Sequence, residues 1–203
     1  MGDFIGTTIS GMTGRGSIRH NNRRFSAANI DRSRTEQNVT FCNDDLKQVY
    51  HEIFDEALEA YNAGKKKTRD KIPDYYEHIR QSKQEKLFHE AIFQIGNLND
   101  CGCGTEGGQR AAEALIEYAK SFQERNPHLH VFNMVLHMDE ATPHLHVDYI
   151  PVATEQTRGP VNESVHEAGA QAAGLYRCWS ETDRVEGLDG SGEGSADGDR
   201  SAA

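Results

Sequence analysis

The chain has 203 residues, enough for one domain of ordinary size with a buried core. Its formal charge of -10 argues against a uniformly basic nucleic-acid-binding protein, and no apolar run is long enough to span a membrane. The N-terminal sequence MGDFIGTTISGMTGRGSIRH lacks a basic start followed by an apolar stretch. We therefore expect no secretory signal and an intracellular protein.

The first half of the chain is predicted to contain one clear helix. Residues 3–9 favour a weak strand, and residues 10–42 look irregular and basic. From Asn43, a good N-cap residue, apolar side chains keep helical spacing until Gly64. Pro73 can then open a second helix through DYYEHIRQSKQE.

The second half alternates strand and helix patterns. KLFHEAIFQIGN predicts a strand, the Gly-rich GNLNDCGCGTEGG a loop, and residues from about 109 to 125 a helix. Two strands follow, at about 128–137 and 144–152. Because the order is mixed and sequential strands come late, we expect an α+β fold with an antiparallel sheet flanked by helices.

Charge is distributed unevenly along this framework. From residue 155 onward there are ten acidic residues and four arginines, whereas GRGSIRHNNRRF near the N-terminus contains arginines and no acid. GKKKTRDK forms a second basic cluster. Local clusters, not total charge, decide whether a phosphate backbone can dock. Residues 161–203 form an acidic, Gly-rich tail that buries too little apolar surface to order itself, so we expect a folded domain at 1–160.

The stretch LHMDEATPHLHVDYIPV concentrates histidines and acids between the two late strands. Alternate side chains of a strand share a face, so His144 and His146 should point the same way, roughly 7 Å apart. Residues 138–143 can turn the chain so that His137 lies opposite His144, and Glu140 in this turn can add a carboxylate. Such a nitrogen and oxygen set suits manganese, zinc, cobalt or nickel better than calcium.

Two other interpretations of the cluster stay open. The histidines can be ordinary strand residues that hydrogen bonds satisfy, or His137 and Glu140 can form the H-x-x-E of a metallohydrolase. Zinc peptidases carry that motif on a helix, so Pro143 and the strand-like flanks argue against it. His128 and His130 have the opposite strand parity from His137, which places them on the other face unless a bulge intervenes.

The cluster H-x-D-E-x-x-P-H-x-H, present as HMDEATPHLH, resembles the third motif of the MobV-type (Pre/Mob) plasmid mobilisation and recombination relaxases. Their histidine-hydrophobic-histidine pair defines a wider superfamily of single-strand DNA nickases. GSIRHNNRRFSAANIDRSRTEQNV resembles the N-terminal motif of the same family. The resemblance covers about residues 8–160, with two separated motifs in the right order.

This resemblance implies a metal-dependent DNA relaxase that nicks and transfers one strand at a plasmid origin of transfer, through a covalent protein–DNA intermediate. His137, His144 and His146 would hold a divalent ion, Mn²⁺ or Mg²⁺, with Glu140 as a further ligand or catalytic neighbour. Asp139 would orient a histidine. The family fold implies that the metal histidines lie on a central strand. The resemblance also implies a protein of the bacterial cytoplasm.

The resemblance also implies that His20 is the nucleophile and that Arg23 clamps the scissile phosphate. Most nickases of the superfamily use tyrosine, but none of the seven tyrosines falls in the basic N-terminal segment. The alternative is a His20 that contacts phosphate without forming a bond. Residues expected to grip single-stranded DNA are Arg15, Arg19, Arg24, Arg32 and Arg34, with Lys65, Lys66, Lys67 and Arg69 more distant.

The sequence departs from the family pattern after about Asn162. Family members continue with helical sequence and an oligomerisation region that allows a homodimer, whereas VHEAGAQAAGLYRCWSETDRVEGLDGSG resembles the next segment translated in a shifted frame. A truncated or frameshifted product is the expectation. The alternative function is therefore a catalytically impaired protein that still binds plasmid-origin DNA.

Overall fold

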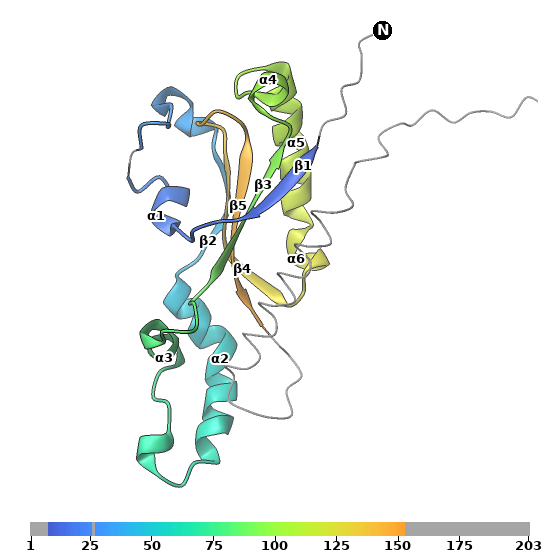
Figure 1. The fold of residues 1–203 in the computed structure, drawn as a ribbon. Helices are drawn as coiled ribbons and strands as arrows, with labels where there is room; N and C mark the ends of the chain where they lie inside the picture. Colours follow the sequence, from blue (N-terminus) through green and yellow to red (C-terminus); the bar gives the residue numbers. More distant parts are fainter. Residues whose placement is uncertain (1–7, 26, 153–203) are drawn as a thin grey trace, which may run out of the picture.

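The computed structural model describes residues 8–25 and 27–152. These residues form a five-stranded antiparallel sheet with helices against both faces (Figure 1), which confirms the α+β prediction. The acidic tail expected at 161–203 and most of the strand expected at 3–9 lie outside the described residues. No helix of the described part is both long and apolar enough to cross a membrane.

The sheet has the strand order β1-β3-β5-β4-β2, so β5 is its central strand. The strands are β1 (Ile9–Thr13), β2 (Val39–Asn43), β3 (His89–Ile95), β4 (Leu129–His137) and β5 (His144–Pro151). The predicted late strands are β4 and β5, and they pair as a hairpin. The expectation of irregular chain over residues 10–42 was wrong at most of β1 and at β2, which form the two edges of the sheet. A bulge between Thr40 and Cys42 interrupts the alternation of β2, and tertiary pairing with β4 completes that strand.

The helices follow local capping signals. They are α1 (Ile18–Asn21), α2 (Leu46–Ala63), α3 (Tyr75–Gln81), α4 (Leu98–Cys101), α5 (Glu106–Lys120) and α6 (Phe122–Arg125), with 3-10 turns at Arg32–Gln37 and Thr68–Asp70. The predicted first long helix is α2, but its N-cap is Asp45, whose side chain accepts from the N–H of Gln48. Asn43 instead ends β2. Gly64 follows the last residue of α2, as predicted.

Two apolar clusters lie on opposite faces of the sheet. One packs α5 and α6 against side chains such as Leu145 and Val147 of β5. The other packs α2 and α3 against Phe132 and Ile150, at one end of the opposite face. The remaining end of that second face carries His137, His144 and His146. Helix α1 packs against β4 on this side of the sheet (Figure 1).

A bulge in β4 changes the expected position of His130. The β4–β5 register shifts between Val131 and Asn133, so His130 pairs with Ile150. Paired residues of an antiparallel ladder point to the same face, which puts His130 on the face of His144 and not on the opposite one. The parity prediction failed there because alternation alone does not reveal a bulge.

Candidate metal centre

The β4–β5 hairpin brings three histidines together. His137 pairs directly with His144, as the turn length predicted, and His146 follows two residues along the central strand. The ring centroids lie 5.1 Å apart for His137 and His144, 4.5 Å for His137 and His146, and 4.9 Å for His144 and His146. His130 lies four strand positions beyond the site, beside Ile150, and His128 is exposed before β4 begins.

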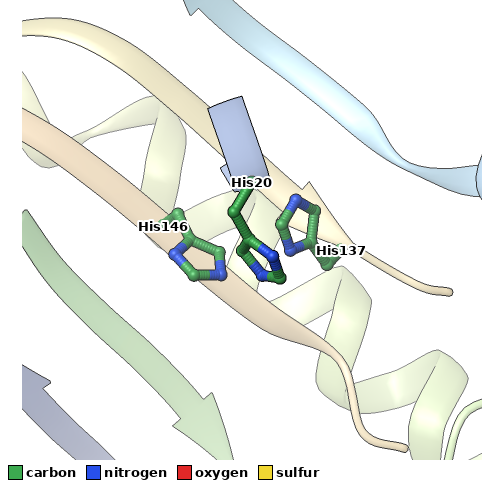
Figure 2. A group of neighbouring side chains, drawn as sticks. All are labelled: His20, His137 and His146. Atoms are coloured by element: carbon green, nitrogen blue, oxygen red, sulfur yellow. The ribbon is translucent and has the colours of Figure 1, made fainter. Parts of the chain in front are cut away.

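His20 enters this group from a different part of the chain. Helix α1 places its ring 5.7 Å from the ring of His137 and 5.8 Å from that of His146, centroid to centroid. Figure 2 shows the three rings gathered over the paired strands. Two separated sequence motifs thus meet in one site, because α1 packs on β4.

Hydrogen bonds assign one tautomer to each strand histidine. His137 Nε2 lies 2.8 Å from the carbonyl oxygen of Asn21, and His144 Nδ1 lies 2.8 Å from the carbonyl oxygen of Thr142. A carbonyl only accepts, so each of these nitrogens carries the proton. His146 Nδ1 donates in the same way to Glu90 Oε1 at 2.6 Å. The lone pairs are therefore on His137 Nδ1, His144 Nε2 and His146 Nε2.

These lone pairs suit a cation. His137 Nδ1 and His144 Nε2 face each other at 3.3 Å, and neither nitrogen has a proton to share when both rings are neutral. Two imidazoles on one ion, with bonds of about 2.0–2.1 Å, place their nitrogens about 3.0–3.4 Å apart. His146 Nε2 is buried without a hydrogen-bond partner. The residues present therefore fit a divalent metal ion.

Burial keeps two of the imidazoles neutral. Desolvation lowers the pKa of His137 to about 2, with His146 adding to the effect. Desolvation also lowers the pKa of His144, again followed by His146. A neutral imidazole is the form that binds metal.

The donor atoms divide into two overlapping sets. His20, His137 and His146 offer three nitrogens within 4.8 Å of one another, and His137, Glu140 and His144 form a second set at the same limit. Neither set contains all three of the predicted ligands His137, His144 and His146, although their rings are neighbours and His137 belongs to both sets. Glu140 belongs to the second set, as the sequence suggested, and its oxygens lie 3.9 Å from His137 Nδ1 and His144 Nε2.

Glu90 is the site residue that sequence reasoning missed. It is buried on β3, where its carboxylate accepts from His146 Nδ1, from the N–H of Gly16 and from Asn21 Nδ2. Burial works to raise its pKa, but these hydrogen bonds outweigh burial and hold the pKa below its ordinary value. A single acid inside the apolar run HEAIFQI was the available signal.

Arg23 holds the turn between the strands in place. Its Nε and Nη2 donate to the two oxygens of Asp139, and Nη2 also reaches Glu140 Oε1 at 2.8 Å. Asp139 is fully buried and accepts further bonds from Thr35 and Asn38. Burial would raise the pKa of Asp139, but its hydrogen bonds, led by Arg23, hold it well below the usual range. Asp139 therefore positions Arg23. The prediction that Asp139 orients a histidine was wrong, because Glu90 is the carboxylate that bonds to a histidine, His146.

His20 lies between a cation and an anion. Its Nε2 is 3.3 Å from Arg23 Nη1 and 3.3 Å from Glu140 Oε1. Burial lowers the pKa of His20, and Arg23 lowers it further. The ring is therefore held in its neutral form with a lone pair available, in a side chain that is 23% exposed.

The remaining predicted DNA contacts differ in exposure. Arg15, Arg19, Arg24 and Arg32 are exposed around α1 and the 3-10 turn that follows it. Arg34 is largely structural, because its guanidinium donates to the carbonyls of Cys103 and Glu140 and pairs with Asp31. The basic cluster at 65–69 lies at the far end of α2, away from α1 (Figure 1).

Tyr50 and Tyr75 are poor candidates for the nucleophile that the family resemblance implies. Tyr50 and Tyr75 are almost fully buried in the α2–α3 cluster. Desolvation raises the pKa of both hydroxyls, with Glu85 adding to it. The Tyr50 hydroxyl donates to the carbonyl of Leu87 at 2.7 Å.

Comparison with known families decides the membership of this chain. The family model Mob_Pre, described as plasmid recombination enzyme, matches residues 15–165. The chain belongs to this family. The match includes α1 with His20 and the whole β4–β5 hairpin, the two parts that form the candidate metal centre.

Similar proteins of this family include plasmid recombination enzymes type 3 from Staphylococcus aureus and Mammaliicoccus lentus. Each is 24% identical over 139 residues, which is 68% of this chain and 29% of the relative. The chain thus spans under a third of the length of these relatives. Two crystal structures of the MobM relaxase domain bound to pMV158 oriT DNA and Mn are also similar. The alignment with the 22-nucleotide complex (TM-score 0.41, 18% identity) covers 86% of this chain and 86% of that one. The alignment with the 23-nucleotide complex (TM-score 0.43, 18% identity) covers 92% of this chain and 93% of that one.

Proposed function

We propose that this Mob_Pre domain nicks one strand of DNA at a plasmid origin and holds the cut strand through a covalent bond to His20. The observation that carries the proposal is the position of His20, whose neutral imidazole lies beside an unsatisfied group of histidine lone pairs. Family membership supplies the substrate class, because the family acts in plasmid recombination.

The proposed metal ligands are His137, His144 and His146, whose ring centroids lie 4.5–5.1 Å apart, with Glu140 as a further ligand or neighbour. These residues would hold a divalent ion, Mn²⁺ or Mg²⁺, which would polarise the scissile phosphate and offset the charge that develops on its oxygens. Glu90 and the carbonyls of Asn21 and Thr142 fix the ring tautomers. Each of the three rings therefore keeps one nitrogen unprotonated and available to a metal ion.

The proposed chemistry is a transesterification at phosphorus. The His20 lone pair attacks, a nitrogen–phosphorus bond forms, and the bond from phosphorus to the 3' oxygen breaks. Arg23 Nη1 lies 3.3 Å from His20 Nε2 and can only donate, so the attacking lone pair is on Nε2, and the proton on Nδ1 is lost to water once the nitrogen–phosphorus bond has formed. The departing 3' oxygen takes a proton from water, and the 5' phosphate stays on the protein. Because a phosphoryl linkage is retained, the same site can rejoin or transfer the strand.

Phosphate binding is assigned to the exposed arginines around α1. Arg15, Arg19, Arg24 and Arg32 remain candidates for the strand near the nick. Arg23 has most of its donors directed at Asp139, Glu140 and the carbonyl of His20. Its proposed role is therefore to position Glu140 and tune His20, in addition to any contact with phosphate.

The test is a covalent-adduct assay. The protein is incubated with Mn²⁺ and a labelled oligonucleotide carrying its plasmid origin, and an adduct that survives denaturant is sought. A phosphoramidate through histidine should be acid-labile, whereas a tyrosyl phosphodiester should not. His20→Ala should abolish the adduct and nicking of supercoiled plasmid while Mn²⁺ affinity persists.

Two results would count against this proposal. An adduct that persists in His20→Ala, or that maps to a tyrosine, would remove His20 as the nucleophile. Binding of origin DNA by the wild-type chain without nicking or adduct would instead favour the alternative, an origin-binding protein without chemistry.

A further inference from the structure

Asn21 occupies the point where α1 meets the metal centre. Its side chain is 1% exposed, although it belongs to a helix of only four residues. Its backbone carbonyl accepts from His137 Nε2 at 2.8 Å. Its side-chain Nδ2 donates to Glu90 Oε1 at 2.7 Å and to Asp148 Oδ2 at 2.9 Å. Asn21 thus contacts the residues of the site through both its backbone and its side chain.

Glu90 extends this contact to a second metal histidine. Its Oε1 accepts both from Asn21 Nδ2 and from His146 Nδ1, and its Oε2 accepts from the N–H of Gly16. Asn21 therefore touches His137 directly and reaches His146 through one shared carboxylate. The segment that carries His20 is held at both of its ends by groups that also orient metal ligands.

The chemistry of the side chain explains why an amide suits this position. Glu90 and Asp148 are both buried, and a buried carboxylate needs donors. The Asn21 amide group supplies two N–H donors, and its Nδ2 contacts both acids. An aspartate would add a third acid, and an alanine would leave both carboxylates short of a donor.

We propose that Asn21 is a positioning residue that couples binding of the metal ion to ordering of the segment carrying His20. This inference rests on the proposed function, since it presumes the metal centre and the role of His20. A bound ion would fix the rings of His137 and His146, which contact Asn21 through its backbone carbonyl and through Glu90. By linkage, order in α1 strengthens ion binding to the same extent that the ion stabilises α1.

The experiment compares Asn21→Ala and Asn21→Ser with a matched control, Asn22→Ala. Asn22 is the adjacent asparagine, but its Nδ2 bonds to Asn43 Oδ1 on the exposed side. Mn²⁺ affinity is measured by calorimetry, and amide hydrogen exchange is followed for residues 17–24 with and without Mn²⁺. In the wild type, Mn²⁺ should slow exchange across this segment. Both Asn21 variants should lose most of that metal-dependent protection and bind Mn²⁺ about tenfold or more weakly, whereas Asn22→Ala should retain both.

The exchange measurement separates coupling from a merely structural role. Asn21→Ser keeps one donor and a small side chain, so it serves if Asn21→Ala does not fold. Circular dichroism of the metal-free variants establishes which of them are folded. Folded Asn21 variants with wild-type Mn²⁺ affinity and wild-type metal-dependent protection would overturn the inference alone. A wild-type chain that binds no Mn²⁺ would overturn the proposed metal centre and this inference together.

Discussion

Replacing Arg23 tests whether its guanidinium acts chiefly to stabilise the fold through Asp139. Its side chain is 11% exposed, and it pairs with Asp139, whose side chain is 0% exposed. Arg23→Ala leaves that carboxylate buried without its cation. Breaking a buried pair in this way costs about 3–5 kcal/mol. Thr35 and Asn38 still donate to Asp139, so we expect a loss near the lower figure, about 3 kcal/mol.

The backbone gives no compensation for this loss. Arg23 has φ 51°, in the left-handed region, where alanine is strained as much as arginine. A loss of about 3 kcal/mol is a large fraction of the 5–15 kcal/mol that stabilises an ordinary domain. The variant should therefore unfold at a clearly lower urea concentration.

The assay is urea unfolding in the absence of metal, with Arg24→Ala as the control. Arg24 is the adjacent arginine and is exposed, so its removal should change the free energy of unfolding by less than about 0.5 kcal/mol. Arg23→Ala combined with Asp139→Asn should cost at least about 1 kcal/mol less than the sum of the single changes. An Arg23→Ala loss equal to that of Arg24→Ala, or additive double-variant behaviour, would refute the reasoning.

Three further outcomes follow from the site and its supports. Alanine at His137, His144 or His146 should weaken Mn²⁺ binding measured by calorimetry, while His128→Ala should leave it unchanged. The reverse pattern would show that the ion binds elsewhere. Tyr50→Phe should lower the free energy of unfolding by about 1 kcal/mol in urea, because the partly buried carbonyl of Leu87 loses its donor; an unchanged midpoint would mean that water replaces the hydroxyl. Gly14→Ala should weaken Mn²⁺ binding, since its Cβ would collide with the Glu90 carboxylate; unaltered affinity would show that Glu90 is not needed in that position.

The local parts of the fold were predictable because their signals are short in range. Helix α2 has an apolar stripe, a capping residue within two positions of the predicted one, and Gly64 after its last residue. The β4–β5 hairpin follows from two apolar runs and a connection of six residues, so the pairing of His137 with His144 could be predicted. Strand alternation then placed His146 on the same face.

Long-range contacts decided the rest. Strand β2 forms because β4 offers a free edge, and the β4 bulge that turns His130 to the other face has no signature in alternating hydrophobicity. The resemblance to relaxases named both motifs, but no spacing rule connects residues 20 and 137. Their contact depends on the packing of α1 on the sheet.

The sequence by itself determined which side chains are available for metal and phosphate chemistry, and that the three strand histidines share one hairpin. Only the tertiary structure decided the supports of that site. Glu90 from β3 orients His146, Asn21 from α1 orients His137, and Asp139 turns away from the histidines toward Arg23. The physical reason is burial: a polar group inside the fold must find a partner, and the partner is chosen by proximity in space, which local sequence patterns do not encode.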